Sequence, residues 1–151
     1  MIDFSETDRL AQLIAAKKQV LDLLAQLAAR QAGLIERGEI SGLLKLLAAK
    51  QTVIAQLQQL ERLLDGFRQQ DPERRTWRSA DDRQRCQQTA RECELLLTQV
   101  VRLEQQCEQE MIRRRDVAAE ALEGFGDRAD AQHAYALPLP CPTPAQLEVQ
   151  G

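Results

Sequence analysis

The chain has 151 residues, of which 44% are hydrophobic but only 3% aromatic, and its 20 basic and 23 acidic residues give a net charge of −3. This length suits one domain rather than two, and the balanced charge argues against a protein that binds nucleic acid or anionic lipid through its overall field. The sequence has no run of about 18 apolar residues and no apolar signal segment at its start, so we expect a cytoplasmic protein without membrane insertion.

The first predicted element is a helix over about residues 6–37. Neither glycine nor proline occurs before Gly33, and Ser5 followed by Asp8 resembles a capping box at the start of a helix. Apolar residues recur at steps of three and four, which predicts an amphipathic helix with one broad apolar face. Lys17 and Gln31 are polar members of the same series.

A second helix is predicted over about residues 40–67. Gly38 stands where a residue of left-handed conformation ends a helix, and Ser41 or Glu39 can cap the next one. The leucine-rich pattern then continues to Phe67, before the break "RQQDPE". Because the connection is so short, the two helices should lie side by side and antiparallel, as a helical hairpin.

A linker over about residues 68–78 precedes a long third helix, expected over about 79–124. This helix could start at Pro72 with Asp71 as its cap, or after Ser79 with Asp82 completing a capping box. A heptad-like series predicts a coiled-coil seam along it. The series comprises Cys86, Ala90, Cys93, Leu97, Val100, Glu104, Cys107, Met111, Arg114, Ala118, Ala121 and Phe125.

The last residues, 126–151, carry a proline at every second position from Pro138 to Pro144. This composition predicts an extended, disordered tail. We therefore expect an all-α protein in which residues 1–125 form an elongated antiparallel hairpin plus a long third helix, a coiled-coil-like three-helix bundle, followed by a flexible Pro-rich tail.

The expected helices differ in length. At about 1.5 Å per residue, a third helix that runs back along the hairpin should pass the Gly38 bend between residues 101 and 108. The segment beyond would expose an apolar surface, which we predict to bind a partner. Its residues are Met111, Ile112, Val117, Ala121, Leu122 and Phe125. Two alternatives remain: the third helix slides or kinks so that this surface is ordinary core, or a homodimer buries it.

Residues that could support chemistry are few. His133 is the only histidine and the four cysteines form no C-x-x-C pair, so we expect no metal, no cofactor and no enzymatic activity. Cys86, Cys93 and Cys107 share one helix face and should be buried small residues, with an intersubunit disulfide or a redox sensor as alternatives.

Charged residues at unusual positions also have simple interpretations. The basic stretches at 72–78 and 113–115 are flanked by acidic residues, which favours linker charges and solvated helix faces over nucleic-acid binding. Glu104, at a seam position, should be a register-setting polar residue or simply exposed. Lys17 should extend its ammonium group towards water from the seam.

The stretch "GLIERGEISGLLKLLAAKQTVIAQL" resembles the FlgN-type flagellar export chaperone family. That family typically shows a helix end, a Gly-acid-apolar bend, leucines at helical spacing and a lysine that closes the run. The matching residues are Leu34, Gly38, Glu39, Ile40, Leu43, Leu47 and Lys50. The order of two helices, a linker, a long third helix and a loose tail also agrees.

The resemblance implies a cytoplasmic chaperone of bacterial flagellum biogenesis that has no ATPase activity. Such a protein would bind the C-terminal amphipathic region of hook-filament junction proteins, mainly through its own C-terminal part. It would prevent their premature assembly and deliver them to the type III export apparatus, with export-gate components as further expected partners. The rival hypothesis is a self-associating coiled-coil scaffold or stalk protein without a client.

Overall fold

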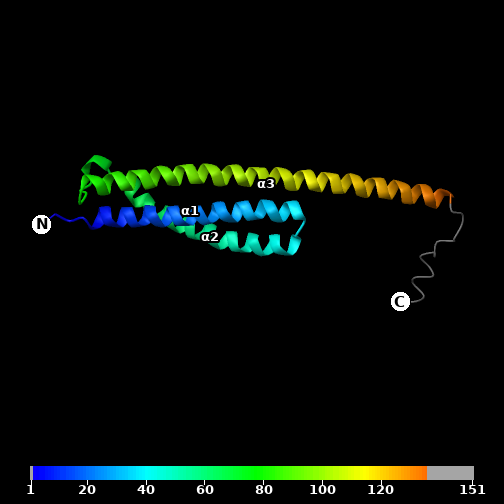
Figure 1. Cartoon of the computed structure of the whole chain (residues 1–151), viewed down its shortest axis with the longest axis horizontal. Helices are drawn as coiled ribbons and strands as arrows, with labels where there is room; N and C mark the ends of the chain where they lie inside the picture. The colour runs from blue at the N-terminus through cyan, green and yellow to red at the C-terminus, as the bar shows by residue number, and fades with distance from the viewer. Residues whose placement is uncertain (1, 136–151) are drawn as a thin grey trace. The chain divides into compact units, whose positions relative to one another are not determined.

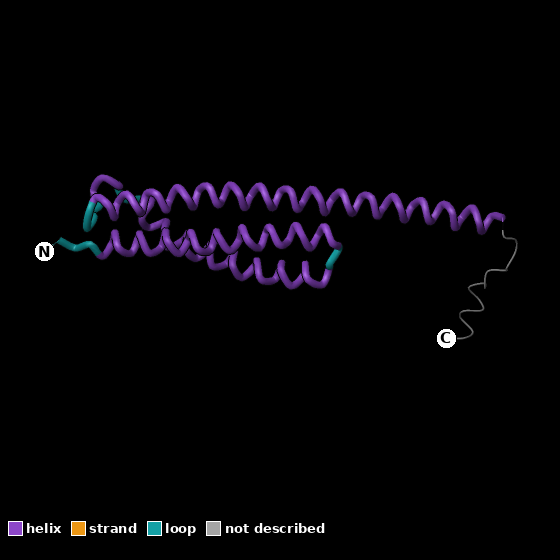
Figure 2. Tube along the Cα trace, in the orientation of Figure 1, coloured by secondary structure: helices purple, strands orange, loops and turns teal. Residues whose placement is uncertain are grey.

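The computed structural model of the chain describes residues 2–135, with side chains as far as residue 129. Its elements are α1 (Ser5–Arg37), α2 (Ile40–Arg68), a short 3-10 helix η1 (Pro72–Arg74) and α3 (Ala80–Tyr135), and every regular element in this range is helical (Figures 1 and 2). The all-α prediction is therefore confirmed. The chain divides into two compact units, Met1–Met111 and Ile112–Gly151, which are described separately below.

The helical hairpin is formed as predicted by the bend at Gly38. This residue ends α1 in the left-handed conformation, with φ of 68°, and its N–H donates to the carbonyl of Ile35 at 3.1 Å. Gly42, in the first turn of α2, serves a different purpose, because a Cβ there would lie 3.1 Å from the side chain of Leu34. Glycine thus lets the start of α2 approach the end of α1 closely.

Three hydrophobic clusters fix the directions of the helices in the first unit. One joins Leu10 near the start of α1, Leu64 near the end of α2 and Cys86 near the start of α3. At the bend, Ile35, Leu43 and Cys107 form another, and the central cluster includes Leu21, Leu24, Leu46, Val53, Cys93 and Val100. These pairings make α2 antiparallel to α1, and α3 parallel to α1, as Figure 1 shows.

The starts of the helices differ in part from the predicted caps. The capping box of Ser5 and Asp8 is wrong: α1 begins at Ser5 itself, whose N–H is accepted by the Asp3 carboxylate at 2.9 Å. Glu39 is the N-cap residue of α2, but its side chain makes no capping hydrogen bond.

Both starts proposed for the third helix are used, by different elements. The Asp71 side chain caps η1 by accepting from the N–H of Glu73 at 3.0 Å. The Ser79 hydroxyl then accepts from the N–H of Asp82 at 3.1 Å at the start of α3, as in the first half of a capping box.

The end of the third helix was predicted too early. We expected it near residue 124 and a tail from 126 onwards, but α3 continues to Tyr135. Gly124 and Gly126 are therefore helical residues rather than the end of the helix. The rest of the predicted Pro-rich tail, 136–151, lies outside the described residues.

Candidate functional site

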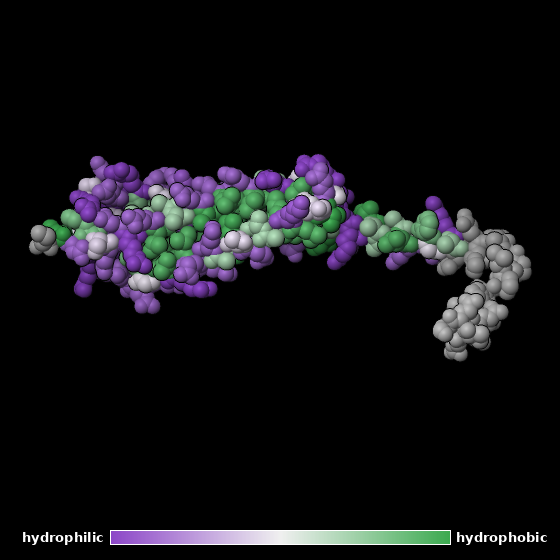
Figure 3. Space-filling model, turned by 90° about the horizontal axis from the view of Figure 1, so that it is seen from below, coloured by the Kyte–Doolittle hydropathy of each residue, from purple (hydrophilic) through white to green (hydrophobic). Residues whose placement is uncertain are grey.

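The predicted partner-binding residues are exposed. Met111, the last residue of the first unit, is exposed, and so are Ile112, Val117, Leu122 and Phe125 of the second unit. Ala121 is exposed as well, like every residue from 115 to 129. Figure 3 shows hydrophobic side chains at the surface of the segment that precedes the residues drawn in grey.

The last buried residue in the described part of α3 is Cys107. It packs against Ile35 and Leu43, which lie on either side of the bend. The length argument placed the passage of the third helix past the bend between residues 101 and 108, and this prediction is confirmed. None of the residues 112–125 is buried within the described chain.

Within the second unit, five apolar residues of different sizes share one side of the helix. Ala118, Ala121, Leu122 and Phe125 follow the i, i+3, i+4, i+7 pattern of a helix face, and Val117 precedes Ala121 by one turn. We call these five residues the apolar stripe. Ile112 lies apart from it, because the step of five positions from Ile112 to Val117 turns about 140° around the helix axis. Ala118 belonged to the predicted seam but was not among the predicted site residues.

Acidic residues occupy the opposite side of this helix. Asp116, Glu120, Glu123 and Asp127 recur at steps of four, three and four, so they form a second face about half a turn away from the apolar stripe. All four are exposed. The segment is therefore amphipathic: one side offers apolar contacts, and the other keeps the helix hydrated.

Inside the first unit, one polar residue from each helix meets in the seam. Lys50 of α2 is 7% exposed, and its ammonium group donates to the Gln31 side-chain carbonyl of α1 at 2.7 Å. The same group forms an ion pair with Glu104 of α3, whose side chain is 35% exposed. Glu104 is thus partly buried and paired. Both charged members of this network are paired with each other, so the network links the three helices by hydrogen bonding and ion pairing.

Lys17 is only partly exposed and forms an ion pair with Glu61 of α2 at 2.6 Å. Burial would raise the pKa of Glu61, but hydrogen bonds from Lys17 and Arg68 outweigh it and leave the pKa lower than usual. The expectation that Lys17 extends towards water from the seam is met in part: it leaves the core by reaching a partner on the neighbouring helix.

The three seam cysteines are buried free thiols. The sulfur of Cys93 lies 3.7 Å from the carbonyl oxygen of Ile14, and that of Cys107 lies 3.9 Å from that of Ala28, both within reach of weak S–H···O bonds. Burial raises the pKa of all three thiols, which disfavours the reactive thiolate. The interpretation as small buried residues is confirmed for these three; Cys141 lies outside the described residues.

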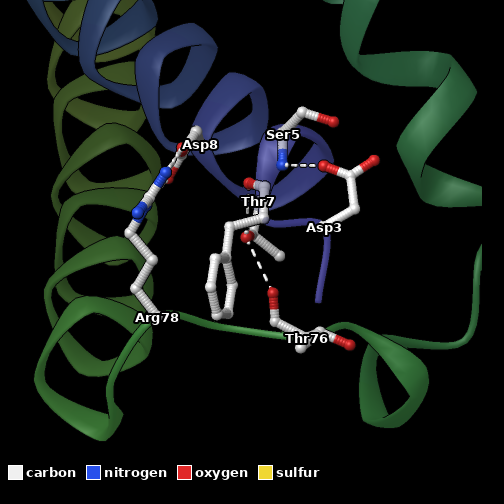
Figure 4. A network of polar contacts seen from close by, with 7 residues as sticks. Asp3, Ser5, Thr7, Asp8, Thr76 and Arg78 are labelled. Carbon is white, nitrogen blue, oxygen red and sulfur yellow. Dashed lines mark hydrogen bonds and ion pairs between the residues drawn. The ribbon is translucent and has the colours of Figure 1, made fainter. Parts of the chain in front are cut away.

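The basic stretch at 72–78 ties the linker to the start of α1. Arg78 donates to the carboxylate of Asp8 at 2.8 Å and lies over the ring of Phe4, 5.0 Å from its centroid. The Thr7 hydroxyl donates to the carbonyl of Thr76 at 2.8 Å, as Figure 4 shows. The hydrogen bond from Arg78 lowers the pKa of Asp8. Arg78 is therefore a linker charge with an intramolecular partner.

Two further properties of the described residues bear on the kind of site. No described helix has a stretch long and apolar enough to span a bilayer. In the same residues, no cluster of three or more His, Cys, Asp or Glu side chains is placed to hold a metal ion. Comparison of the chain with protein-family models, with curated proteins and with solved structures finds no match.

Proposed function

We propose that this protein is a cytoplasmic flagellar export chaperone of the FlgN type, without enzymatic activity. It would bind the C-terminal amphipathic region of hook-filament junction proteins, prevent their premature assembly and deliver them to the type III export apparatus. The observation that supports this proposal is the exposed apolar stripe of the second unit, because an uncovered apolar surface on a helix is suited to binding a partner.

The stripe has the chemistry needed to capture an amphipathic helix. Leu122 and Phe125 are 72% and 73% exposed, and burying each against a partner would contribute about 1.5–3 kcal/mol. The alanines at 118 and 121 would let a partner helix approach closely. Since association costs about 4–15 kcal/mol, these side chains alone give weak binding, and the client must contribute further contacts.

The residues of the family resemblance have identifiable structural roles. Leu34, Leu43 and Leu47 pack in or against the cluster at the bend, and Gly38 makes the turn. Lys50 holds the three-helix network together. These roles explain why such a motif suits a helical hairpin, so it supports the architecture more directly than it supports a particular client.

Self-association is the second candidate, because a second copy could cover the same stripe. This would make the protein a coiled-coil scaffold without a client, as a helix with an unburied apolar stripe commonly forms homo-oligomers. The two candidates differ in what fills the stripe at low protein concentration: a client helix in one case, and an identical chain in the other.

The test combines Leu122→Ser with Phe125→Ser in the full chain. The matched control is Leu95→Ser, because Leu95 lies in the first unit and is also 72% exposed. Titration calorimetry would measure binding of a synthetic peptide with the C-terminal helical sequence of a hook-filament junction protein from the same genome. We expect the double variant to bind at least about a hundredfold more weakly and the control to bind like the unaltered chain.

The opposite results are equally clear. If the unaltered chain does not bind the peptide, or the double variant binds it equally well, the proposal fails. Analytical sedimentation of the same three proteins measures their oligomeric state and so tests the self-association candidate. A dimer that the double variant dissociates and the control does not would replace the chaperone with the self-associating scaffold.

A further inference from the structure

A half-open cavity of about 320 Å³ lies in the first unit, at the end of the hairpin away from the bend. All three helices and the linker contribute to its wall. Its apolar part consists of Leu10, Ile14, Leu64, Phe67, Trp77 and Cys86. Two of the few aromatic residues in the chain thus face the same space. A cavity of this size is at the lower end of those that bind small molecules.

Four basic residues also line the cavity, but three of them already have carboxylate partners. Lys17 and Arg68 both pair with Glu61, and Arg83 pairs with Glu73 at 3.3 Å. Arg75 is different, since it forms no ion pair with any described residue. The cavity wall therefore carries one guanidinium group whose charge is not neutralised by a nearby side chain.

The hydrogen bonds of Arg75 are also incomplete. One terminal nitrogen donates to the main-chain carbonyl of Phe67 at 2.6 Å. Its Nε is buried and has no hydrogen-bond acceptor. Burial raises the pKa of the neighbouring Cys86 thiol, and the positive charge of Arg75 opposes that rise. Arg75 is therefore a half-buried residue of the cavity wall whose charge has no carboxylate partner among the described residues.

A buried donor on a charged group is costly when it lacks an acceptor, and a carboxylate is the acceptor that fits a guanidinium best. Glu94 is the one carboxylate on the cavity wall, but it is exposed and does not pair with Arg75. A ligand that suits this wall would combine an anionic end for Arg75 with an apolar body for Phe67 and Trp77.

We propose that this cavity binds a small apolar carboxylate, with the carboxylate on Arg75 and the apolar body against Phe67, Trp77 and Leu10. This site is independent of the apolar stripe. Two sources share the required chemistry: a free acid with a short hydrocarbon chain, and the C-terminal residue of a peptide.

Trp77 makes the proposal directly testable, because it is the only tryptophan in the chain. Octanoate would be titrated into the full-length protein while tryptophan fluorescence is recorded, with octan-1-ol as the uncharged probe of equal length. We expect octanoate to give a saturable change and octanol to bind at least about tenfold more weakly, since octanol lacks the charge-assisted hydrogen bond.

The matched variants are Arg75→Gln and Arg74→Gln. Arg74 precedes Arg75 directly, but its side chain is 89% exposed and lies 3.8 Å from the Asp71 carboxylate. We expect Arg75→Gln to weaken octanoate binding at least about tenfold and Arg74→Gln to leave it unchanged. Circular dichroism melts check that both variants fold. If Arg75→Gln does not fold, the Nε–H resonance of Arg75 in the unaltered chain should shift on octanoate addition.

The proposal is overturned if octanoate gives no saturable change, if octanol binds as tightly, or if a folded Arg75→Gln variant binds like the unaltered chain. Titrating N-acetyl-leucyl-phenylalanine and its amide separates the two sources. Tighter binding of this free acid than of octanoate, with no binding of the amide, identifies a peptide terminus. The reverse order of the two acids identifies a free hydrocarbon acid.

Discussion

Lys50 brings a full positive charge into the seam where the three helices of the first unit meet. Its ammonium group is satisfied from both sides, by the Gln31 carbonyl and by the Glu104 carboxylate. A charge in such a place is tolerated only while its partners stay in position. The network therefore favours one rotational and axial setting of the three helices over others, as single polar residues do in coiled coils.

We predict that Glu104→Leu lowers the free energy of unfolding by about 2 kcal/mol. Removing one partner of a fully buried pair costs about 3–5 kcal/mol, and the effect is reduced here because the Glu104 side chain is 35% exposed. Adding Lys50→Met to Glu104→Leu should restore most of the lost stability, since the double variant no longer contains an unpaired charge at residue 50. Urea unfolding measures each value.

Lys45→Met is the control, because Lys45 is an exposed residue of the same helix and should change stability by less than about 0.5 kcal/mol. If Glu104→Leu leaves the free energy of unfolding unchanged, the prediction is contradicted. That result would mean that Lys50 reaches water when its partner is removed.

The sequence identified the members of this network only separately. Gln31 and Glu104 fell at seam positions, and Lys50 belonged to the family-like stretch. A heptad pattern shows which side of each helix is turned inwards, but not which residues of three helices come to the same level.

The burial of Arg75 could not be predicted from the sequence for a related reason. Its neighbours in sequence are linker charges, and its buried Nε and its hydrogen bond to Phe67 of α2 arise only in the folded chain.

At the scale of elements, two glycines should respond in opposite ways to the same substitution. Gly38 has φ of 68°, and a Cβ there would meet no atom within 4 Å, so Gly38→Ala adds only backbone strain. We expect it to cost about 1–2 kcal/mol. Gly66 lies inside α2, also with open space around it. Gly66→Ala should stabilise the protein by about 0.5–1 kcal/mol.

Thermal or urea unfolding of the two variants side by side measures the change in the free energy of unfolding that each substitution causes. Because neither substitution changes side-chain packing, each serves as the control for the other. If Gly66→Ala destabilises the protein, the backbone at residue 66 differs from the helical conformation described. If Gly38→Ala leaves the stability unchanged, the backbone at residue 38 differs from the left-handed conformation described.

The elements themselves were predictable because their boundaries depend on strong local signals. Gly38 and the Asp71–Pro72 pair end or restart helices through their backbone geometry, which a sequence displays directly. Weaker local signals gave wrong predictions of a helix end and of a helix cap. Gly124 and Gly126 each cost a helix only about 1 kcal/mol relative to alanine, which is too little to end it among good helix formers. Ser5 resembled a cap, but the Asp3 carboxylate is used instead.

At the scale of the whole molecule, the two units differ in how their helices are stabilised. The first unit buries Leu21, Leu24 and Val100 in its core. From 115 to 129, the second unit exposes every residue, so its helix depends on intrinsic propensity and on any partner that binds it. A surface kept free in this way is what a binding helix needs, and its low local stability should be measurable.

We therefore predict that the amides of residues 115–129 exchange with deuterium orders of magnitude faster than those of Leu21, Leu24 and Val100. Core amides require unfolding of the first unit, whereas the exposed helix opens locally. Gly124→Ala with Gly126→Ala should slow the fast exchange by up to about thirtyfold, because each adds about 1 kcal/mol of helix stability. The core amides serve as the internal control and should not change. Protection of 115–129 equal to that of Val100, if it weakens on dilution, would instead mean that a second copy of the chain covers the apolar stripe.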